Sequence, residues 1–178
     1  HALELTSRSR SIYDGMDRPW DQVANGLFAA RAAISAGDPT LGRELLDDVG
    51  RWLEQVDDPW MHTRFDAANG ELMRVEHRFD EAVVHIARAA ETSRRLGFRQ
   101  TEAYQVSCLG RAQWQAGDFE AGATTLARSI EKAEAIGDVR MAALARVHLG
   151  RVLRSLGRVD EARVELLSAT EWHRAAGG

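Results

Sequence analysis

Side chains that could carry out catalysis are few and scattered in this chain of 178 residues. Cys108 could act as a nucleophile if a histidine such as His148 lay beside it. Because Cys108 precedes a leucine in a stretch with helical spacing, we interpret it as a buried and inert thiol. His62 and Asp66 are spaced i, i+4, and we interpret them as a solvated pair on one helix face.

Metal and phosphate chemistry have equally little support in the sequence. His77 and His85 could hold a metal on either side of a predicted corner, but we interpret them as surface histidines. A P-loop requires Gly-Lys-Ser/Thr, and the single lysine of the chain, Lys132, lies in the segment IEKAE. We therefore expect no catalytic residue, no metal site and no cofactor, and we predict that the chain is not an enzyme.

Arginine and aromatic side chains recur at a fixed interval along the chain, and their chemistry is that of binding. A guanidinium group pairs bidentately with a carboxylate, and aromatic rings anchor a partner by burial. The alternative interpretation is that these arginines only solvate exposed helix faces. The candidate binding residues are Arg31, Arg64, Glu71, Arg74, Tyr104, Arg111, Trp114, Arg151 and Arg154.

One repeated segment supplies the elements that would position these residues. The stretch LGRVLRSLGRVDEARVELLSA at 149–169 aligns with 109–129, 69–89 and 29–49 at successive equal shifts. Its apolar side chains follow helical spacing on both sides of Gly157, a residue that can adopt the positive φ of a helix end. The repeat therefore predicts antiparallel helical hairpins joined by short corners.

We expect the whole chain, 1–178, to be a single array of such hairpins. Asp supplies an N-cap oxygen and Pro suits the first helical turn in the two corners DRPW and DDPW. The predicted first helices cover 20–36 and 60–76 and begin near 99 and 139, and the second helices cover 40–56, 80–96, 120–136 and 160–175. The array divides into the second helix of a truncated repeat at 1–16 and hairpins at 17–56, 57–96, 97–136 and 137–176.

Glycines recur inside the predicted first helices, at Gly70, Gly110 and Gly150. Glycine in a helix interior costs about 1 kcal/mol relative to alanine. A cost that recurs in each repeat predicts a compensating close approach of the paired helix. The matching small residues of the second helices are Gly42, Ala82, Gly122 and Ala162.

The order of small residue, corner, apolar residue, small residue and large apolar residue, as in Gly150, Gly157, Val159, Ala162 and Leu166, resembles the tetratricopeptide repeat (TPR). The resemblance covers nearly the whole chain, although the period here is about 40 residues and the usual TPR period is about 34 residues. It implies an all-α, right-handed α-solenoid whose first helices line a concave groove. The choice of candidate residues rests on this resemblance, because particular first-helix columns face the groove in that family. HEAT repeats would also suit the period, but no proline interrupts the first helices here.

More narrowly, the Arg-rich and Ala-rich repeats with Gly-Asp corners resemble the C-terminal TPR arrays of large bacterial transcriptional regulators, SARP-like or ATP-binding LuxR-type. This resemblance implies a non-enzymatic scaffold for protein interaction or ligand sensing within a larger regulator. The alternatives are a stand-alone peptide-binding adaptor or signalling-peptide receptor, and, in third place, a helical phosphatase. The lysine/asparagine clamp of chaperone-binding TPRs is absent from these columns.

Composition limits the partners and the compartment. A net charge of −4 provides no general attraction to nucleic acid or to an anionic membrane. A single cysteine, with neither a signal-peptide pattern nor an apolar run of about 20 residues, fits a cytoplasmic protein. We expect a protein or peptide partner of acidic character. We also expect end-to-end self-association, because Val152, Leu156, Val164 and Leu167 lack a following helix to cover them.

Overall fold

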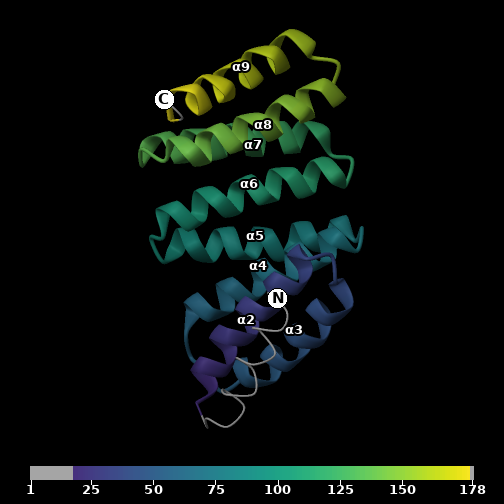
Figure 1. Ribbon diagram of the computed structural model, residues 1–178, viewed down its shortest axis with the longest axis vertical. Coiled ribbons are helices and arrows are strands. Elements are labelled where there is room, and N and C mark those ends of the chain that lie inside the picture. The colour runs from purple at the N-terminus through teal and green to yellow at the C-terminus, as the bar shows by residue number, and fades with distance from the viewer. Residues whose placement is uncertain (1–17, 177–178) are drawn as a thin grey trace. The chain divides into compact units, whose positions relative to one another are not determined.

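The computed structural model describes residues 18–176, and their side chains as far as Thr170, as helices joined by short corners. This part of the chain contains no strand, so the fold is all-α (Figure 1). The helix expected within 1–16 lies outside the described residues. The helices are α2 (Pro19–Ser35), α3 (Pro39–Leu53), α4 (Pro59–Val75), α5 (Phe79–Arg95), α6 (Arg99–Gln115), α7 (Phe119–Ala135), α8 (Val139–Ser155) and α9 (Val159–Ala176).

The chain divides into two compact units between His85 and Ile86, inside α5. In the first unit, α2 packs against α3, and α4 packs against both of them. In the second unit, α6 packs against α7 and α8 against α9, while α8 also contacts α6 and α7. Within each unit, the first helices of successive hairpins therefore lie side by side, as the repeat predicts.

Each unit has its own apolar core between the helices of its hairpins. In the first unit Leu27, Leu46 and Val49 are buried. In the second unit Leu126 and Val152 are fully buried. Burying each such side chain away from water contributes about 1.5–3 kcal/mol to the free energy of folding. The core positions belong to the apolar columns of the repeat, so the hydrophobic pattern accounts for the packing of the hairpins.

Close helix approach at Gly110 and Gly150 confirms the prediction at these two positions. A Cβ atom on Gly110 would lie 2.7 Å from Leu126 Cγ and 3.0 Å from the Gly122 carbonyl oxygen. A Cβ atom on Gly150 would lie 2.7 Å from Leu166 Cγ. Because α6 and α8 approach their partner helices at these points, the cost of a helical glycine is offset by packing.

The corners follow the predicted pattern with one exception. Gly117 and Gly157 have φ of 92° and 74°, the left-handed region that glycine adopts without strain. At the equivalent position His77 adopts φ of 61° although it has a side chain. Its ring lies edge-on to Phe79, with the ring centroids 5.5 Å apart.

Polar contacts between first helices recur in every second hairpin. The indole Nε1 of Trp20 donates to Asp58 Oδ2 at 3.0 Å, and Gln100 Nε2 donates to Asp138 Oδ2 at 3.1 Å. Each bond joins the start of one first helix to the start of the next first helix. The intervening equivalent position holds Phe98, which offers no side-chain acceptor. A period of two hairpins is therefore superimposed on the apolar period of a single hairpin.

The helix caps and the exposed apolar residues correct two predictions. Asp58 caps α4 by accepting from the Trp60 amide at 2.9 Å, but the N-cap residue of α2 is Arg18, which makes no side-chain cap bond. Asp17 lies outside the described residues.

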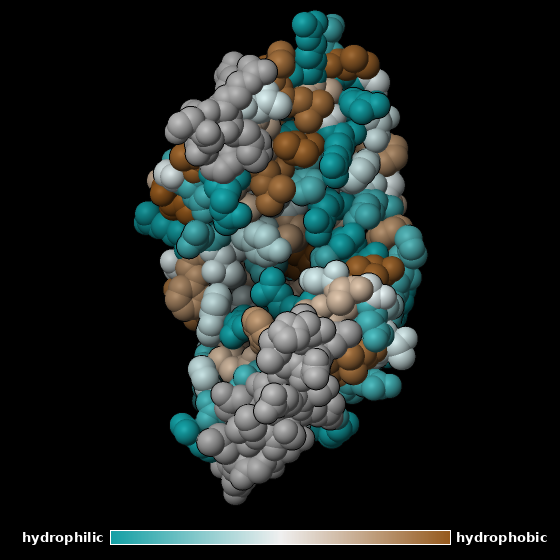
Figure 2. All heavy atoms as spheres, in the orientation of Figure 1, coloured by the Kyte–Doolittle hydropathy of each residue, from teal (hydrophilic) through white to brown (hydrophobic). Residues whose placement is uncertain are grey.

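Val164 and Leu167 are exposed as expected, whereas Val152 is completely buried against the hairpin core. The face in Figure 2 shows exposed apolar residues interspersed among hydrophilic ones.

Candidate functional site

The candidate binding residues all lie on first helices. Four of them belong to the first unit and five to the second. In the first unit Arg31 lies on α2, and Arg64, Glu71 and Arg74 lie on α4. In the second unit the positions are Tyr104, Arg111 and Trp114 on α6, and Arg151 and Arg154 on α8. Each set is described within its own unit.

Arg31 and Arg64 lie in the first unit, on the helices α2 and α4, which pack against each other. Arg31 is exposed, and Arg64 is half-buried. Burial is the main cause that lowers the pKa of the Arg64 guanidinium, and the charge of Arg31 lowers it further. An arginine pKa is so high that this lowering leaves Arg64 charged at neutral pH. Neither Arg31 nor Arg64 forms an ion pair within the part of the chain that the structure describes.

Arg74 differs, because an acid neighbour on its own helix binds it. Its Nε donates to Glu71 Oε2 at 2.9 Å and its Nη2 donates to Glu71 Oε1 at 2.5 Å. This bidentate pair fixes both side chains. The sequence placed both residues on one face, but it did not predict that Glu71 would neutralise Arg74.

The second unit holds an aromatic ring beside two further arginines. Trp114 is half-buried, and its indole Nε1 donates to Ser155 Oγ at 3.0 Å, which ties the end of α6 to the end of α8. Ser155 in turn donates to the Arg151 carbonyl oxygen at 3.3 Å. Arg151 and Arg154 are exposed and make no ion pair with any described residue. Sequence reasoning missed Ser155, although it directly follows Arg154, the repeat equivalent of Trp114.

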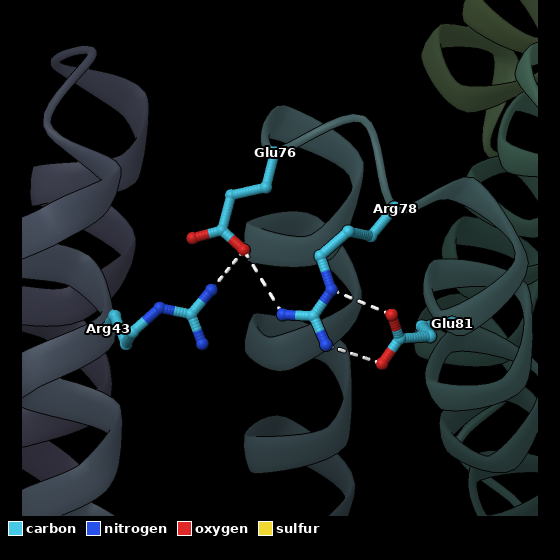
Figure 3. Close-up of polar contacts among 4 residues, drawn as sticks. All are labelled: Arg43, Glu76, Arg78 and Glu81. Carbon is cyan, nitrogen blue, oxygen red and sulfur yellow. Dashed lines mark hydrogen bonds and ion pairs between the residues drawn. The ribbon is translucent and has the colours of Figure 1, made fainter.

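Acid partners do neutralise arginines elsewhere on the helices. Arg78 donates to Glu81 through Nε at 2.7 Å and Nη2 at 2.5 Å, and to Glu76 at 3.4 Å (Figure 3). Glu76 also accepts from Arg43 on α3. The hydrogen bond from Arg78 lowers the pKa of Glu81. Arg18, Arg51, Arg78, Arg94 and Arg158 likewise each pair with an acid three residues away, and none of these five is in the candidate set.

The histidine predictions need correction. Asp66 is buried, and its Oδ1 lies 3.1 Å from His85 Nδ1 on the neighbouring helix α5. His62 Nε2 instead lies 3.2 Å from the Val56 carbonyl oxygen. The interpretation of His62 and Asp66 as a solvated pair was therefore wrong, because Asp66 points toward its hairpin partner. His85 is likewise half-buried rather than on the surface.

Catalytic and metal-binding arrangements are not evident among the described side chains. Cys108 is half-buried rather than fully buried, and His148 is buried. No group of three or more histidine, cysteine or acidic side chains within 18–170 could hold a metal ion. None of the described helices is long and apolar enough to cross a membrane.

Comparisons with known proteins concern the fold. No protein-family model matches the chain, and no curated protein is significantly similar to it. The aspartyl phosphate phosphatase F of Bacillus subtilis superposes with a TM-score of 0.87 at 10% identity, over 98% of this chain and 46% of its own. The chain therefore spans about half the length of that protein.

Two further solved structures contain repeats of the same kind. A STAND protein (signal transduction ATPase with numerous domains) from Pyrococcus horikoshii, which has a tetratricopeptide repeat sensor, gives a TM-score of 0.78 at 14% identity, over 97% of this chain and 28% of its own. The TPR-like repeats of a putative kinesin light chain from Podosopora anserina give 0.77 at 15% identity, over 95% and 84%. At these identities the likeness establishes the fold alone. The protein has an all-α, TPR-like solenoid fold.

Proposed function

We propose that this chain is a protein-binding scaffold whose first helices bind acidic segments of a partner. The observation that supports it is the state of the arginines on the first helices of each unit. Four of the six candidate arginines make no ion pair with any described residue: Arg31, Arg64, Arg151 and Arg154. A guanidinium group without an internal acid remains available for a carboxylate of a partner.

Trp114 adds an anchoring surface to the arginines of the second unit. Its hydrogen bond to Ser155 holds the indole in one orientation, so binding against the ring costs little side-chain entropy. Arg151 and Arg154 lie on the same helix as Ser155. Acidic and apolar side chains of one peptide can then contact the arginines and the ring together, as aromatic and arginine residues do at binding hot spots.

The wider biological role follows from the resemblance to regulator arrays. We propose that the chain is the regulatory region of a larger bacterial transcriptional regulator in the cytoplasm, and that it acts by binding without catalysis. The STAND neighbour, in which tetratricopeptide repeats form a sensor, supports this role by analogy of fold. Reading the complete gene tests it. A DNA-binding and a nucleotide-binding domain encoded before this segment would support the proposal, and a gene that encodes neither would contradict it.

The binding proposal is tested with a peptide array of acidic and basic sequences probed with the purified chain. We expect selective binding of the acidic peptides, weakened by salt because the interaction is electrostatic. Arg154→Glu should weaken that binding by about tenfold or more, as expected for a charge-assisted hydrogen bond. The matched control is Arg128→Glu, an exposed arginine on the second helix α7 that makes no ion pair with a described residue. Equal loss in both variants, or no preference for acidic peptides, would overturn the proposal.

A further inference from the structure

A cavity lies in the second unit at the corner that joins α7 to α8. We call it the α8 cavity. Its volume is about 680 Å³, which is within the range of protein binding pockets. The start of α6, the corner and the start of α8 all contribute to its lining, which includes Arg99, Gln100, Ile136, Asp138, Val139 and Arg140. The α8 cavity is therefore at the opposite end of α6 and α8 from Trp114, Arg151 and Arg154.

An equivalent cavity in the first unit, the α4 cavity, shows that the repeat builds this kind of site. Its volume is about 470 Å³, and its lining includes Pro19, Trp20, Val56, Asp58 and Pro59, which occupy the equivalent positions two hairpins earlier. In each cavity one lining side chain donates to the lining aspartate, from Trp20 Nε1 at 3.0 Å and from Gln100 Nε2 at 3.1 Å. The architecture of the corner thus forms the cavity, and the side chains at variable positions decide what it can bind.

The two cavities differ in the sign of their charge. The charged residues that line the α4 cavity are Asp57 and Asp58. The α8 cavity is lined instead by Arg99, Arg140 and a single acid, Asp138. Arg99 and Arg140 are both exposed, so a ligand in the α8 cavity can reach them. The first-unit cavity therefore disfavours an anion, and the second-unit cavity has an excess of positive charge that attracts one.

Asp138 does not cancel that excess. Its Oδ2 accepts from Gln100 and its Oδ1 accepts from the Met141 amide at 2.9 Å, so each carboxylate oxygen is held by a donor of the chain. The charge of Arg140 also acts on this carboxylate and contributes to its lowered pKa. Two guanidinium groups and one carboxylate still leave the lining with a net positive charge.

Apolar surface adjoins these charges in the α8 cavity. Ile136 is half-buried, and 57% of the Val139 surface is exposed. Both residues line the same cavity as the two arginines. A ligand that carries an apolar group beside its carboxylates can therefore bury that group here, which favours its binding by removing apolar surface from water.

We propose that the α8 cavity binds an acidic peptide segment of the partner, whose carboxylates contact Arg99 and Arg140 while a neighbouring apolar side chain packs on Ile136 and Val139. This inference rests on the proposed function, because it assigns a second position in the second unit at which the acidic partner is bound. A guanidinium group forms charge-assisted hydrogen bonds with a carboxylate. Each arginine can bind a separate carboxylate, so the two side chains need only contact the same segment.

NMR titration of the isotope-labelled chain with the end-blocked peptide Glu-Leu-Glu locates the binding. We expect the backbone amides of Gln100, Gly137 and Arg140 to shift. The amides of Asp57 and Asp58 should not shift, because the α4 cavity repels the peptide. The uncharged peptide Gln-Leu-Gln should shift neither set. Equal shifts at both cavities, or equal shifts with both peptides, would overturn the inference.

Substitutions test the two arginines. Arg99→Gln and Arg140→Gln should each raise the Kd of Glu-Leu-Glu by about tenfold or more, because each removes a charge-assisted hydrogen bond. The matched control Arg128→Gln, on the exposed face of α7, should leave the Kd unchanged. All three arginines are exposed, so we expect the Tm to stay the same in all three variants. An unchanged Kd in both Arg99→Gln and Arg140→Gln would overturn the inference.

The same titration separates this inference from the proposed function. Shifts confined to the surroundings of Trp114, Arg151 and Arg154 would overturn the α8 cavity as a site and leave the proposed function standing. Shifts at the cavity, with a Kd that Arg154→Glu does not change, would support the cavity and overturn the binding role proposed for Arg154. The absence of shifts with Glu-Leu-Glu throughout the chain would overturn the inference.

Discussion

Arg146 Nη1 donates to Glu165 Oε2 at 2.7 Å across the hairpin of α8 and α9. The equivalent positions two hairpins earlier are Asp66 and His85, which bond across the hairpin of α4 and α5. The remaining hairpins hold Gly26 with Leu45 and Val106 with Thr125 at these positions. A polar pair between the two helices is thus a feature of every second hairpin.

Arg146→Val should destabilise the chain by about 1–3 kcal/mol, because it leaves the partly buried Glu165 without its donor. The double variant Arg146→Val with Glu165→Thr copies the natural pair Val106 and Thr125, and we expect it to recover most of that loss. Urea unfolding of both single variants and the double variant measures the coupling. Additive losses in the double variant would show that the pair contributes no coupling energy.

Gly110→Ala should destabilise the chain by about 1–3 kcal/mol through overpacking, because the new Cβ atom would meet Leu126 and the Gly122 backbone. Gly50→Ala is the matched control within helix α3. There the new atom would lie 3.6 Å from a Phe65 ring carbon, an ordinary contact, so alanine should stabilise the helix by up to about 1 kcal/mol. Chemical denaturation of both variants checks the opposite signs, and a loss of equal size at both positions would contradict close approach at Gly110.

Trp20→Phe should raise the pKa of Asp58 toward its ordinary value. The indole hydrogen bond is the largest cause that lowers this pKa in the folded chain. A lowered folded-state pKa stabilises the fold above the unfolded-state pKa, and the stabilisation is lost as pH falls through the folded-state pKa. The unaltered chain should therefore exceed the variant in stability above about pH 4, and the difference should close below it. NMR titration of the Asp58 carboxyl carbon measures the shift directly.

Gln100→Leu provides the comparison at the equivalent bond. The backbone amide of Met141 is the largest cause that lowers the pKa of Asp138, and Gln100 is the second. The Met141 bond survives the substitution, so the pKa of Asp138 should rise but stay below its ordinary value. A complete return to the ordinary value would contradict the larger contribution of the Met141 amide.

Glu102→Gln should destabilise the second unit and expose Lys132 to reagents. Lys132 Nζ lies 2.7 Å from the buried Glu102 Oε1, and removing the carboxylate leaves a half-buried ammonium group without its charge partner, at a cost of about 1–3 kcal/mol. Because Lys132 is the only lysine, its acetylation by an amine-reactive reagent can be followed by peptide mass spectrometry as a measure of this one side chain. Faster acetylation is expected in Glu102→Gln and an unchanged rate in Glu131→Gln, a neighbouring exposed acid. Equal rates in both variants would contradict a protective ion pair.

The repeat made the helices predictable, whereas the polar contacts needed the structure. Periodic apolar residues and corner glycines placed the helix bounds close to those observed, since those signals are local. The i, i+4 spacing of His62 and Asp66 concerns one helix only. It does not show that Asp66 on α4 faces the neighbouring helix α5, where it bonds to His85. The pair of Glu71 and Arg74 lies within one helix, but the spacing alone did not show that these two side chains bond while Arg64 makes no ion pair with a described residue. The single array, the helix within 1–16 and end-to-end association remain predictions.

The alternation of Trp20–Asp58 and Gln100–Asp138 has a consequence for how such a gene can change length. Recombination that removed 57–96 would set Trp20 against Phe98 in place of Asp58, so a donor would lose its acceptor. Duplication or loss of two hairpins at once keeps every donor opposite its acceptor. Lineages that lengthen or shorten this array should therefore do so by pairs of hairpins, even though a single hairpin is the unit that the apolar pattern repeats.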